Sequence, residues 1–423
     1  MGRSNAVEPS SGESGVKPAS FGAVFAVGEF RALFAAHLLS VLGDQFARMA
    51  LAVLVYRRTA SAGLAALAYA LTLLPDLVGG PLLSGLADRL PRRLLMIGCD
   101  LARALLVALM ALPGAPLWIL CLLLVAVQLL NSPFSAARAA LLAVILQDDL
   151  YVAGSAVSNI SFQFAQLAGF ATGGLLIAGV GPPQALLIDA ATFLGSALLV
   201  RLGVARRTVR PDSDAQQQKP GWWRSLVAGA RLVWIDRRLR ALVALACVSG
   251  FYITVEGLAV PYAASLGGGA AAAGLLLAAN PAGSVIGMIM LTRWVPPRSR
   301  LRWIGPLAVA ACLPLLGSAA QPGLMVTATL WALSGAFSAF QIPANAAFMQ
   351  AVPDANRGQA FGLAVTALRT AQGAGILIGG VAADQWSPAA AVAGAGVLGV
   401  LFATLAGLAW TGATRASARA AEA

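Results

Sequence analysis

The segment Gln166–Gly174, QLAGFATGG, decides the fold, because its pattern recurs at Gln372–Gly380, QGAGILIGG. Both stretches read Q-x-x-G-x-x-x-G-G and lie 206 residues apart inside long apolar segments. The same shift superposes further pairs, namely Pro75 on Pro281, Pro91 on Pro297, Arg92 on Arg298 and Asp148 on Asp354. A shift shared by so many positions predicts that the chain consists of two similar halves.

The composition places these halves in a membrane. Of 423 residues, 59% are hydrophobic and 11% are charged, whereas a soluble domain has about 25% charged residues. This excludes a soluble enzyme. Because a spanning helix needs about 20 apolar residues, the apolar total suffices for on the order of a dozen spans. A β-barrel would alternate in polarity instead of forming long apolar runs.

Twelve apolar segments divide evenly between the halves. They lie at 30–56, 62–86, 94–112, 115–136, 152–178, 182–202, 239–263, 268–292, 302–320, 322–346, 358–380 and 387–411. The sequence therefore predicts an all-α integral membrane protein with twelve transmembrane helices in two pseudo-symmetric six-helix bundles. The expected order is a disordered tail over 1–29, a bundle over 30–202, a linker over 203–238, a bundle over 239–411 and a tail over 412–423.

The charges predict the orientation. The net charge is +12, and the basic residues cluster in loops on one side of the predicted helices. Positively charged loops stay inside, so we expect a bacterial inner-membrane protein with both termini cytoplasmic. Residues 1–20 contain no apolar stretch, so no cleavable signal peptide is expected. The clustering argues for membrane lipids and against nucleic acid as partners, and an amphipathic helix over 222–240 is expected to lie on the inner leaflet.

The residues that enzymes need are missing from the sequence. The four cysteines are scattered without C-x-x-C spacing, and the chain has a single histidine, so no metal site is expected. No lysine follows a glycine as in a phosphate-binding loop, and no G-x-S-x-G motif is present. We therefore expect no cofactor and no enzymatic activity.

Four stretches resemble one membrane-protein family. They are 30–56, the loop Leu86–Arg93 (LADRLPRR), 134–174 and Asp189–Leu194 (DAATFL). On these residues the chain resembles the major facilitator superfamily, and within it the branch of macrolide-efflux and enterobactin-exporter-like proteins. The resemblance implies a secondary transporter that works by alternating access, with export as its direction.

The chain departs from the family's patterns at several positions. Ser84 and Pro91 replace two glycines of the loop signature, and Phe170 replaces the proline of the antiporter signature. Val125 stands where many proton antiporters of the family carry an arginine. This puts the usual coupling residue in doubt.

Two acidic residues are candidates for carrying a proton. An ionisable group inside a membrane costs about 3 kcal/mol or more, so each one needs an explanation. His37, Ser40, Asp44 and Arg48 form one helical stripe in the first span. Asp44 is either a proton-linked acid modulated by Arg48 or half of a static ion pair, and His37 is either a packing residue or a pH sensor. Glu256 in the seventh span has no helical cation within four residues, and we rank it level with Asp44.

Polar stripes on other spans predict a substrate cavity. Spans one, four, seven and ten carry most of them, and the resemblance implies that these spans surround the cavity. Polar residues also join helices, so each single one can be structural. The candidate cavity residues are Ser40, Gln128, Asn131, Asn159, Gln163, Tyr252, Ser338, Gln341 and Arg369.

Two further sets have predicted mechanical roles. The resemblance implies a cytoplasmic charge relay that gates the halves, formed by Asp88, Arg89, Arg92, Arg93, Asp100 and Arg103. Small residues allow helices to approach closely and to bend, which is the role expected of Gly169, Gly173, Gly174, Gly375, Gly379 and Gly380.

Together these observations predict a monomeric, proton-coupled exporter of a hydrophobic or amphipathic small molecule, such as a drug, an antibiotic or a siderophore. The direction of transport follows from the resemblance and from no particular residue. An importer or lipid flippase of the same fold remains the alternative, followed by a membrane sensor or enzyme that transports nothing.

Overall fold

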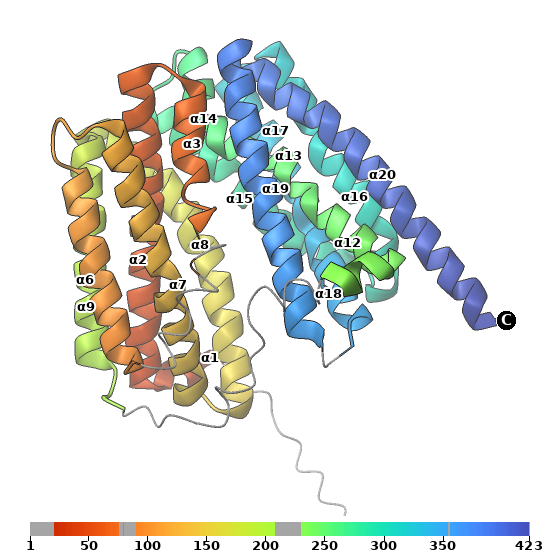
Figure 1. Cartoon of the computed structure of the whole chain (residues 1–423), viewed down its shortest axis with the longest axis horizontal. Coiled ribbons are helices and arrows are strands. Elements are labelled where there is room, and N and C mark those ends of the chain that lie inside the picture. The colour runs from red at the N-terminus through yellow and green to blue at the C-terminus, as the bar shows by residue number, and fades with distance from the viewer. Residues whose placement is uncertain (1–20, 76–78, 80–89, 208–229, 354–355, 423) are drawn as a thin grey trace, which may run out of the picture.

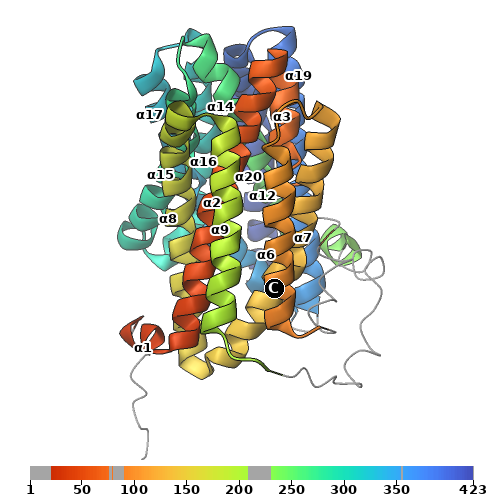
Figure 2. The same ribbon diagram turned by 90° about the vertical axis from the view of Figure 1, so that its left-hand side faces the viewer.

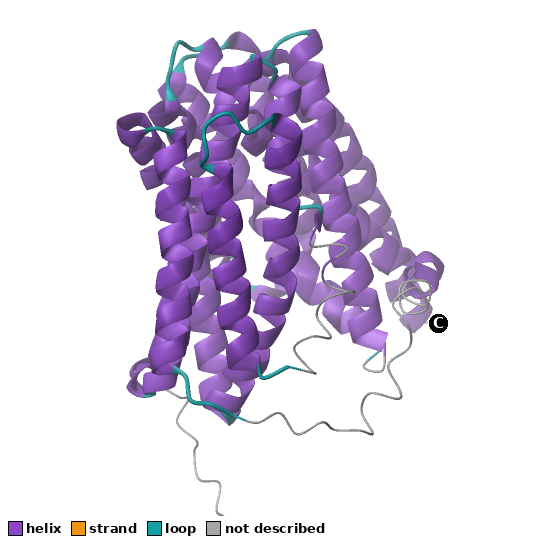
Figure 3. Cartoon of the chain, turned by 60° about the vertical axis from the view of Figure 1, so that its left-hand side comes forward, coloured by secondary structure: helices purple, strands orange, loops and turns teal. Residues whose placement is uncertain are grey.

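The computed structural model describes residues 21–75, 79, 90–207, 230–353 and 356–422, and all regular structure in these residues is helical (Figure 1; Figure 3). The helices are α1 (Phe21–Ala26), α2 (Gly28–Thr59), α3 (Ala62–Ala70), α6 (Arg92–Met110), α7 (Leu117–Ile145), α8 (Asp148–Val180), α9 (Pro182–Gly203), α12 (Arg237–Cys247), α13 (Ser249–Tyr252), α14 (Thr254–Ser265), α15 (Ala270–Trp294), α16 (Pro297–Leu316), η1 (Gly317–Ala320), α17 (Leu324–Phe337), η2 (Ser338–Phe340), α18 (Gln341–Ala351), α19 (Arg357–Gln385) and α20 (Pro388–Glu422).

Ten helical segments in the described residues are long and apolar enough to cross a membrane. Two of the twelve expected spans are not among these ten. α6 is 19 residues long but carries Arg92, Arg93, Asp100 and Arg103. The other begins as α3, of which nine helical residues are described. With these two helices, the arrangement agrees with the expected twelve spans.

Part of the N-terminal tail is more ordered than the sequence predicts, and the last helix extends further than expected. Phe21–Ala26 forms α1 inside the segment expected to be disordered. The reason is aromatic packing, because the ring of Phe25 lies 5.4 Å from that of Phe30 and 5.2 Å from that of Phe34. At the other end, α20 continues to Glu422, through the residues expected to form a tail.

The first half packs around α2, which lies against α8 and α9 (Figure 2). α6 fills the space between α7 and α9. The interior of this half contains large apolar side chains that are almost fully buried, including Phe30, Phe134 and Phe193. Burial of each such side chain stabilises the bundle by about 1.5–3 kcal/mol.

In the second half, the helical backbone of two spans is locally irregular. The seventh consists of α12, α13 and α14, and the tenth consists of α17, η2 and α18, yet each runs on as one helical segment, Arg237–Ser265 and Leu324–Ala351. The backbone at Val248, Ile253 and Ser338 stays in the right-handed helical region. Close backbone packing accompanies both places, because Gly250 lies against the carbonyl of Ala371 and Gly335 lies against the carbonyl of Asn280.

The two Q-x-x-G-x-x-x-G-G segments make equivalent contacts in the two halves. In α8, Gly169 and Gly173 pack on Gln45 and Phe46 of α2, and Gly174 crosses to Gly274 of α15. In α19 the equivalent glycines follow the same scheme. Gly375 and Gly379 pack on α13 and α14, and Gly380 crosses to α3. The first two glycines of each motif thus hold one half together, and the third joins the halves.

The halves meet at one end of the molecule. We call the end where Arg92, Arg201, Arg302 and Arg415 lie the arginine-rich end, and the opposite end the arginine-poor end. The α8–α15 and α3–α19 contacts involve the helix ends at the arginine-poor end. The helices of the two halves diverge toward the arginine-rich end, at the bottom of Figure 1. The structure is therefore closed at the arginine-poor end.

Candidate functional site

A buried hydrogen bond connects the two halves in the interior. The hydroxyl of Tyr69 on α3 donates to Oε2 of Glu256 on α14 at 2.6 Å. Tyr69 is 1% exposed and Glu256 is 8% exposed. The positive charges that act on this carboxylate belong to Arg48 on α2 and Arg369 on α19. Each half thus contributes one guanidinium group whose charge favours the anionic form of Glu256, while burial of the carboxyl group favours its neutral form.

The seventh span carries Glu256 just after an irregular turn. The backbone at Val248 and Ile253 stays in the right-handed helical region, and the N–H groups of Ile253 and Glu256 donate to the carbonyls of Ser249 and Ile253, both at 2.9 Å. The helix therefore continues through this turn, and Tyr252 and Glu256, four residues apart, lie on one face of it.

The seventh and tenth spans meet next to this carboxylate. The Gln341 side-chain amide donates to the Tyr252 hydroxyl at 2.8 Å. Ser338 donates to the carbonyl of Gly335 at 2.7 Å and lies 3.0 Å from the hydroxyl of Ser284 on α15. Three predicted cavity residues, Tyr252, Ser338 and Gln341, therefore lie together where the irregular turns of the seventh and tenth spans face each other.

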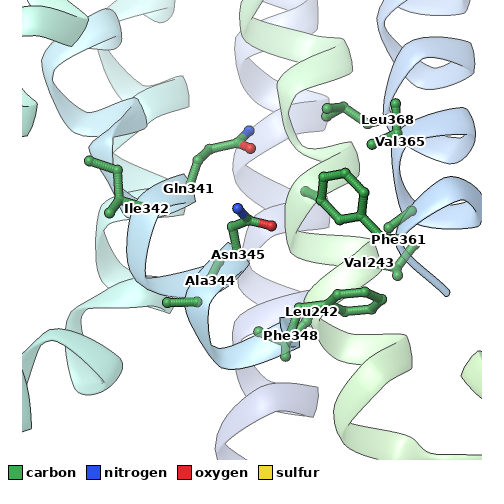
Figure 4. Close-up of a pocket in the computed structure, with 13 residues that line it drawn as sticks. Leu242, Val243, Gln341, Ile342, Ala344, Asn345, Phe348, Phe361, Val365 and Leu368 are labelled. Atoms are coloured by element: carbon green, nitrogen blue, oxygen red, sulfur yellow. The ribbon is translucent and has the colours of Figure 1, made fainter. Parts of the chain in front are cut away.

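A cavity of about 560 Å³ lies beside these residues, between α12, α18 and α19 (Figure 4). We call it the apolar cavity. Its polar side chains are the amides of Gln341 and Asn345, and its other lining residues are Leu242, Val243, Ala246, Ile342, Ala344, Ala346, Phe348, Phe361, Ala364, Val365 and Leu368. Sites for small organic ligands combine apolar walls with a few polar groups in this way. Phe361 could not be selected from the sequence, because an apolar residue on an apolar helix does not stand out from its neighbours.

A second charged cluster lies inside the first half. Asp100 is 3.8 Å from Arg103 and accepts a hydrogen bond of 2.6 Å from Ser196 of α9. The Arg103 guanidinium lies between the rings of Phe134 and Phe193, 4.5 and 4.8 Å from their centroids. Both charged residues are at most 1% exposed. The structure thus places Asp100 and Arg103 deep within one bundle, and their gating role stays a prediction.

Asp44 belongs to this cluster. Its charge acts on Asp100 and on Asp189, a fully buried residue of α9. Three carboxyl groups from three helices therefore share the neighbourhood of Arg103. Arg48, four residues along the same helix, lies instead near Tyr69 and Glu256. The stripe that the sequence predicts therefore extends from the cluster around Arg103 to the buried pair of Tyr69 and Glu256.

The remaining predicted residues are placed as follows. The His37 ring stacks on Phe162 at 6.1 Å. Ser40 and Gln128 are buried, Asn131 and Gln163 are half-buried, and Asn159 is exposed. None of these residues lines the apolar cavity.

Arg92 donates to the carbonyl of Ala140 at 3.2 Å, and Arg93 donates to the carbonyls of Val200 and Arg201. Both thus hold helices of the first half together, and Asp88 and Arg89 lie outside the described residues.

The sequence analysis missed Asp384, near the end of α19. Its carboxylate accepts hydrogen bonds from the backbone N–H groups of Ala62 (2.6 Å) and Gly63 (3.0 Å) and from the Ser61 hydroxyl (2.7 Å). It therefore caps the N-terminus of α3 from the other half of the molecule. One signal was available, because an acidic residue in the last turn is unfavourable for its own helix and so implies a partner elsewhere.

Substitution of Asp384 by alanine should weaken the closed arginine-poor end. Loss of a cap costs about 1 kcal/mol, so the closed population should fall roughly fivefold relative to the open one. We expect this as a longer distance between spin labels at Leu64 and Trp386, in a protein without its native cysteines. Gln385→Ala, at the neighbouring exposed position, is the control and should leave the distance unchanged. An unchanged distance in Asp384→Ala would show that the cap does not hold this end.

The sequence and the fold match known proteins to different extents. The family model described as Major Facilitator Superfamily matches residues 33–332. No curated protein matches at a significant level. Solved structures with a similar fold include a bacterial homologue of the human lysosomal transporter Spinster, in an inward-facing and occupied conformation. It is 13% identical with a TM-score of 0.68, and the match covers 91% of this chain and 96% of that one.

Two other transporters have the same fold. The nucleoside transporter NupG is 13% identical with a TM-score of 0.71, and the match covers 91% of this chain and 99% of that one. A POT family transporter in complex with 5-aminolevulinic acid is 12% identical with a TM-score of 0.71, and the coverage is 91% and 96%. At these identities the similarity establishes the fold.

Proposed function

The chain belongs to the Major Facilitator Superfamily of membrane transporters, and from this premise we propose that it is a proton-coupled exporter of hydrophobic or amphipathic small molecules. The export direction rests on the resemblance of 30–56 and 86–93 to the macrolide-efflux branch. The observation that carries proton coupling is the hydrogen bond between Tyr69 and Glu256, which joins the halves through a group that can bind a proton.

The loop charges support an orientation for this proposal. Positively charged loops stay in the cytoplasm, so we take the arginine-rich end as cytoplasmic, in a bacterial inner membrane. The structure then represents a state that is closed to the outside. We take Glu256 to be anionic in this state, because Tyr69 donates a hydrogen bond to it and the charges of Arg48 and Arg369 favour the anion.

Protonation of Glu256 links this state to its opposite. A neutral carboxyl group loses the attraction of the two guanidinium groups, so the contact between the halves weakens. A proton that enters from outside thus stabilises the outward-open state, in which substrate leaves. The protonated carrier then returns to the state that is open to the cytoplasm, where release of the proton restores the anion and stabilises the closed arginine-poor end. One proton moves inward for each substrate molecule that moves outward.

The apolar cavity supports the substrate class. Its volume of about 560 Å³ lies within the range of roughly 300–1,000 Å³ for drug-sized ligands. Phe348 and Phe361 offer aromatic surface, while Gln341 and Asn345 offer hydrogen bonds without charge. Such a lining suits a neutral or weakly charged amphipathic molecule better than a strongly hydrated one.

Transport assays in proteoliposomes test the proposal. The purified chain is reconstituted with erythromycin as a macrolide and ethidium as a lipophilic cation. We expect counterflow of at least one probe without a gradient, and faster transport toward the acidic side when a pH gradient is imposed. A transport rate that is the same with and without the pH gradient would overturn proton coupling. If neither probe moves and a pump-deficient host gains no resistance across a drug panel, the proposed substrate class is wrong.

A further inference from the structure

A second cavity lies at the arginine-rich end of the second half, away from the apolar cavity's amides. Its volume is about 760 Å³, and it is lined by residues of α12, α16, α18 and α20. Three of these are Arg238, Arg302 and Arg415, so three positive charges from three different helices converge on one space. We call it the three-arginine cavity.

Within the described part of the chain, the guanidinium groups of this cavity have no hydrogen-bond or ion-pair partner. Among the described residues, none of the three makes a hydrogen bond or an ion pair, and the Nε atom of Arg238 is buried without a partner. Other arginines at helix ends are used differently. Arg300 donates to the carbonyls of Val295 and Thr292, both at 2.8 Å. The arginines of the cavity therefore have donors available for a ligand.

The rest of the lining fits an anion with an apolar portion. Among the residues that the structure describes, no aspartate or glutamate lines the cavity. The nearest described acid on these helices, Asp236, caps α12 by accepting from the backbone N–H of Arg238 at 2.7 Å. The Gln350 amide adds hydrogen-bonding capacity, while Leu242, Leu301 and Trp410 supply an apolar wall. Guanidinium groups bind phosphate oxygens with paired, charge-assisted hydrogen bonds.

The depth of the cavity matches the lipid headgroups. Trp234, Trp294 and Trp303 are 75%, 68% and 50% exposed and lie at the same end of the second half as the cavity. Tryptophan is enriched at the interface between membrane and water. Basic pockets between spanning helices on the cytoplasmic side bind anionic lipid headgroups.

We propose that the three-arginine cavity binds a phosphate group, and that an anionic phospholipid of the adjacent leaflet supplies it. A soluble phosphate ester is the other source of the same chemistry. Because the ligand would contact α12, α18 and α20 together, it would hold the cytoplasmic ends of the seventh and tenth spans in place. Leu242 lines both cavities, so this site is positioned to influence the apolar cavity. The inference rests on the membrane fold and not on the direction or coupling of transport.

Thermal unfolding of the full chain in detergent tests the site. The probes are dioleoylphosphatidylglycerol, the zwitterionic lipid dioleoylphosphatidylcholine and inorganic phosphate. We expect phosphatidylglycerol to raise the Tm by several degrees in a saturable manner, and phosphatidylcholine to have little effect. The variant Arg238→Gln/Arg302→Gln/Arg415→Gln should weaken the apparent affinity at least tenfold. Arg237→Gln removes the same charge from a neighbouring exposed position that does not line the cavity, and should behave as wild type.

The outcomes distinguish a phospholipid ligand from a soluble phosphate ligand, and both from the absence of a phosphate site. Stabilisation by inorganic phosphate equal to that by the lipid, lost in the triple variant, assigns the site to soluble phosphate compounds and supports the shared chemistry. An equal response to phosphatidylglycerol in the wild type and the triple variant overturns the site. If the triple variant does not fold, the single variants Arg302→Gln and Arg415→Gln, both at exposed positions, replace it and should each weaken binding severalfold. Loss of transport with intact lipid binding would count against the proposed function alone.

Discussion

Replacing Glu256 by glutamine is expected to abolish the acceleration of export by a pH gradient, while exchange of substrate without a gradient continues. Glutamine keeps the size and the hydrogen bond to Tyr69 but cannot release a proton. It therefore resembles the protonated state at every pH. Because the variant has no proton to release, transport with a pH gradient should fall to the rate measured without one.

Two further variants make this result specific. Tyr69→Phe removes the hydrogen bond but leaves the acid, so we expect slower transport that still responds to the gradient. Glu29→Gln changes an acid at the arginine-rich end that pairs with Arg207 at 2.6 Å, and should transport normally. If Asp44→Asn abolishes the response to the gradient and Glu256→Gln does not, the coupling acid lies in the cluster of the first half instead.

Replacing Gly174 by valine is expected to prevent closure of the arginine-poor end. A Cβ atom at Gly174 would lie 2.7 Å from the Cα of Gly274 and 3.0 Å from the carbonyl oxygen of Ala270. These are backbone atoms and cannot rotate aside as a side chain can. Overpacking typically costs about 1–3 kcal/mol, which shifts the balance between closed and open states by roughly five- to 150-fold. Net transport should fall accordingly.

The measurement is again the distance between spin labels at Leu64 and Trp386, which should shift to a longer and broader distribution. Gly179→Val is the matched control, because it lies on the same helix with no atom within 4 Å of the added Cβ. It should leave both the distance and transport unchanged. A Gly174→Val protein with the wild-type distance distribution would contradict the role assigned to this contact.

The fold could be predicted from the sequence because its main cause is local. A run of apolar residues forces helical backbone in a bilayer, and the repeated Q-x-x-G-x-x-x-G-G motif marks equivalent positions in the two halves. The irregular turns at Val248, Ile253 and Ser338–Phe340 could not be predicted, since the local sequence is that of a regular apolar helix. They lie where distant helices pack closely, as Gly250 does on Ala371.

The candidate site could be predicted only in part, for the same reason. Glu256 stood out because an acid in an apolar helix is costly, but its partner Tyr69 is 187 positions away in the chain. The sequence ranked Asp44 level with Glu256, and the structure places the two acids in different environments. Asp384 was overlooked because its cap on α3 depends on the packing of two distant helices. The periodicity of the sequence indicates which residues lie on the same face of a helix. Only the assembled structure shows what that face contacts.

The charges buried in α6 have a consequence for how the protein is made. Taken alone, this helix would expose Asp100 and Arg103 to acyl chains. Ser196, Phe193 and Phe134, which surround these charges in the finished bundle, are synthesised later. We therefore expect α6 to leave the translocon poorly on its own and to be retained beside it until α7 and α9 emerge. Biogenesis of the first half is then a concerted step, in which a late helix completes the insertion of an early one.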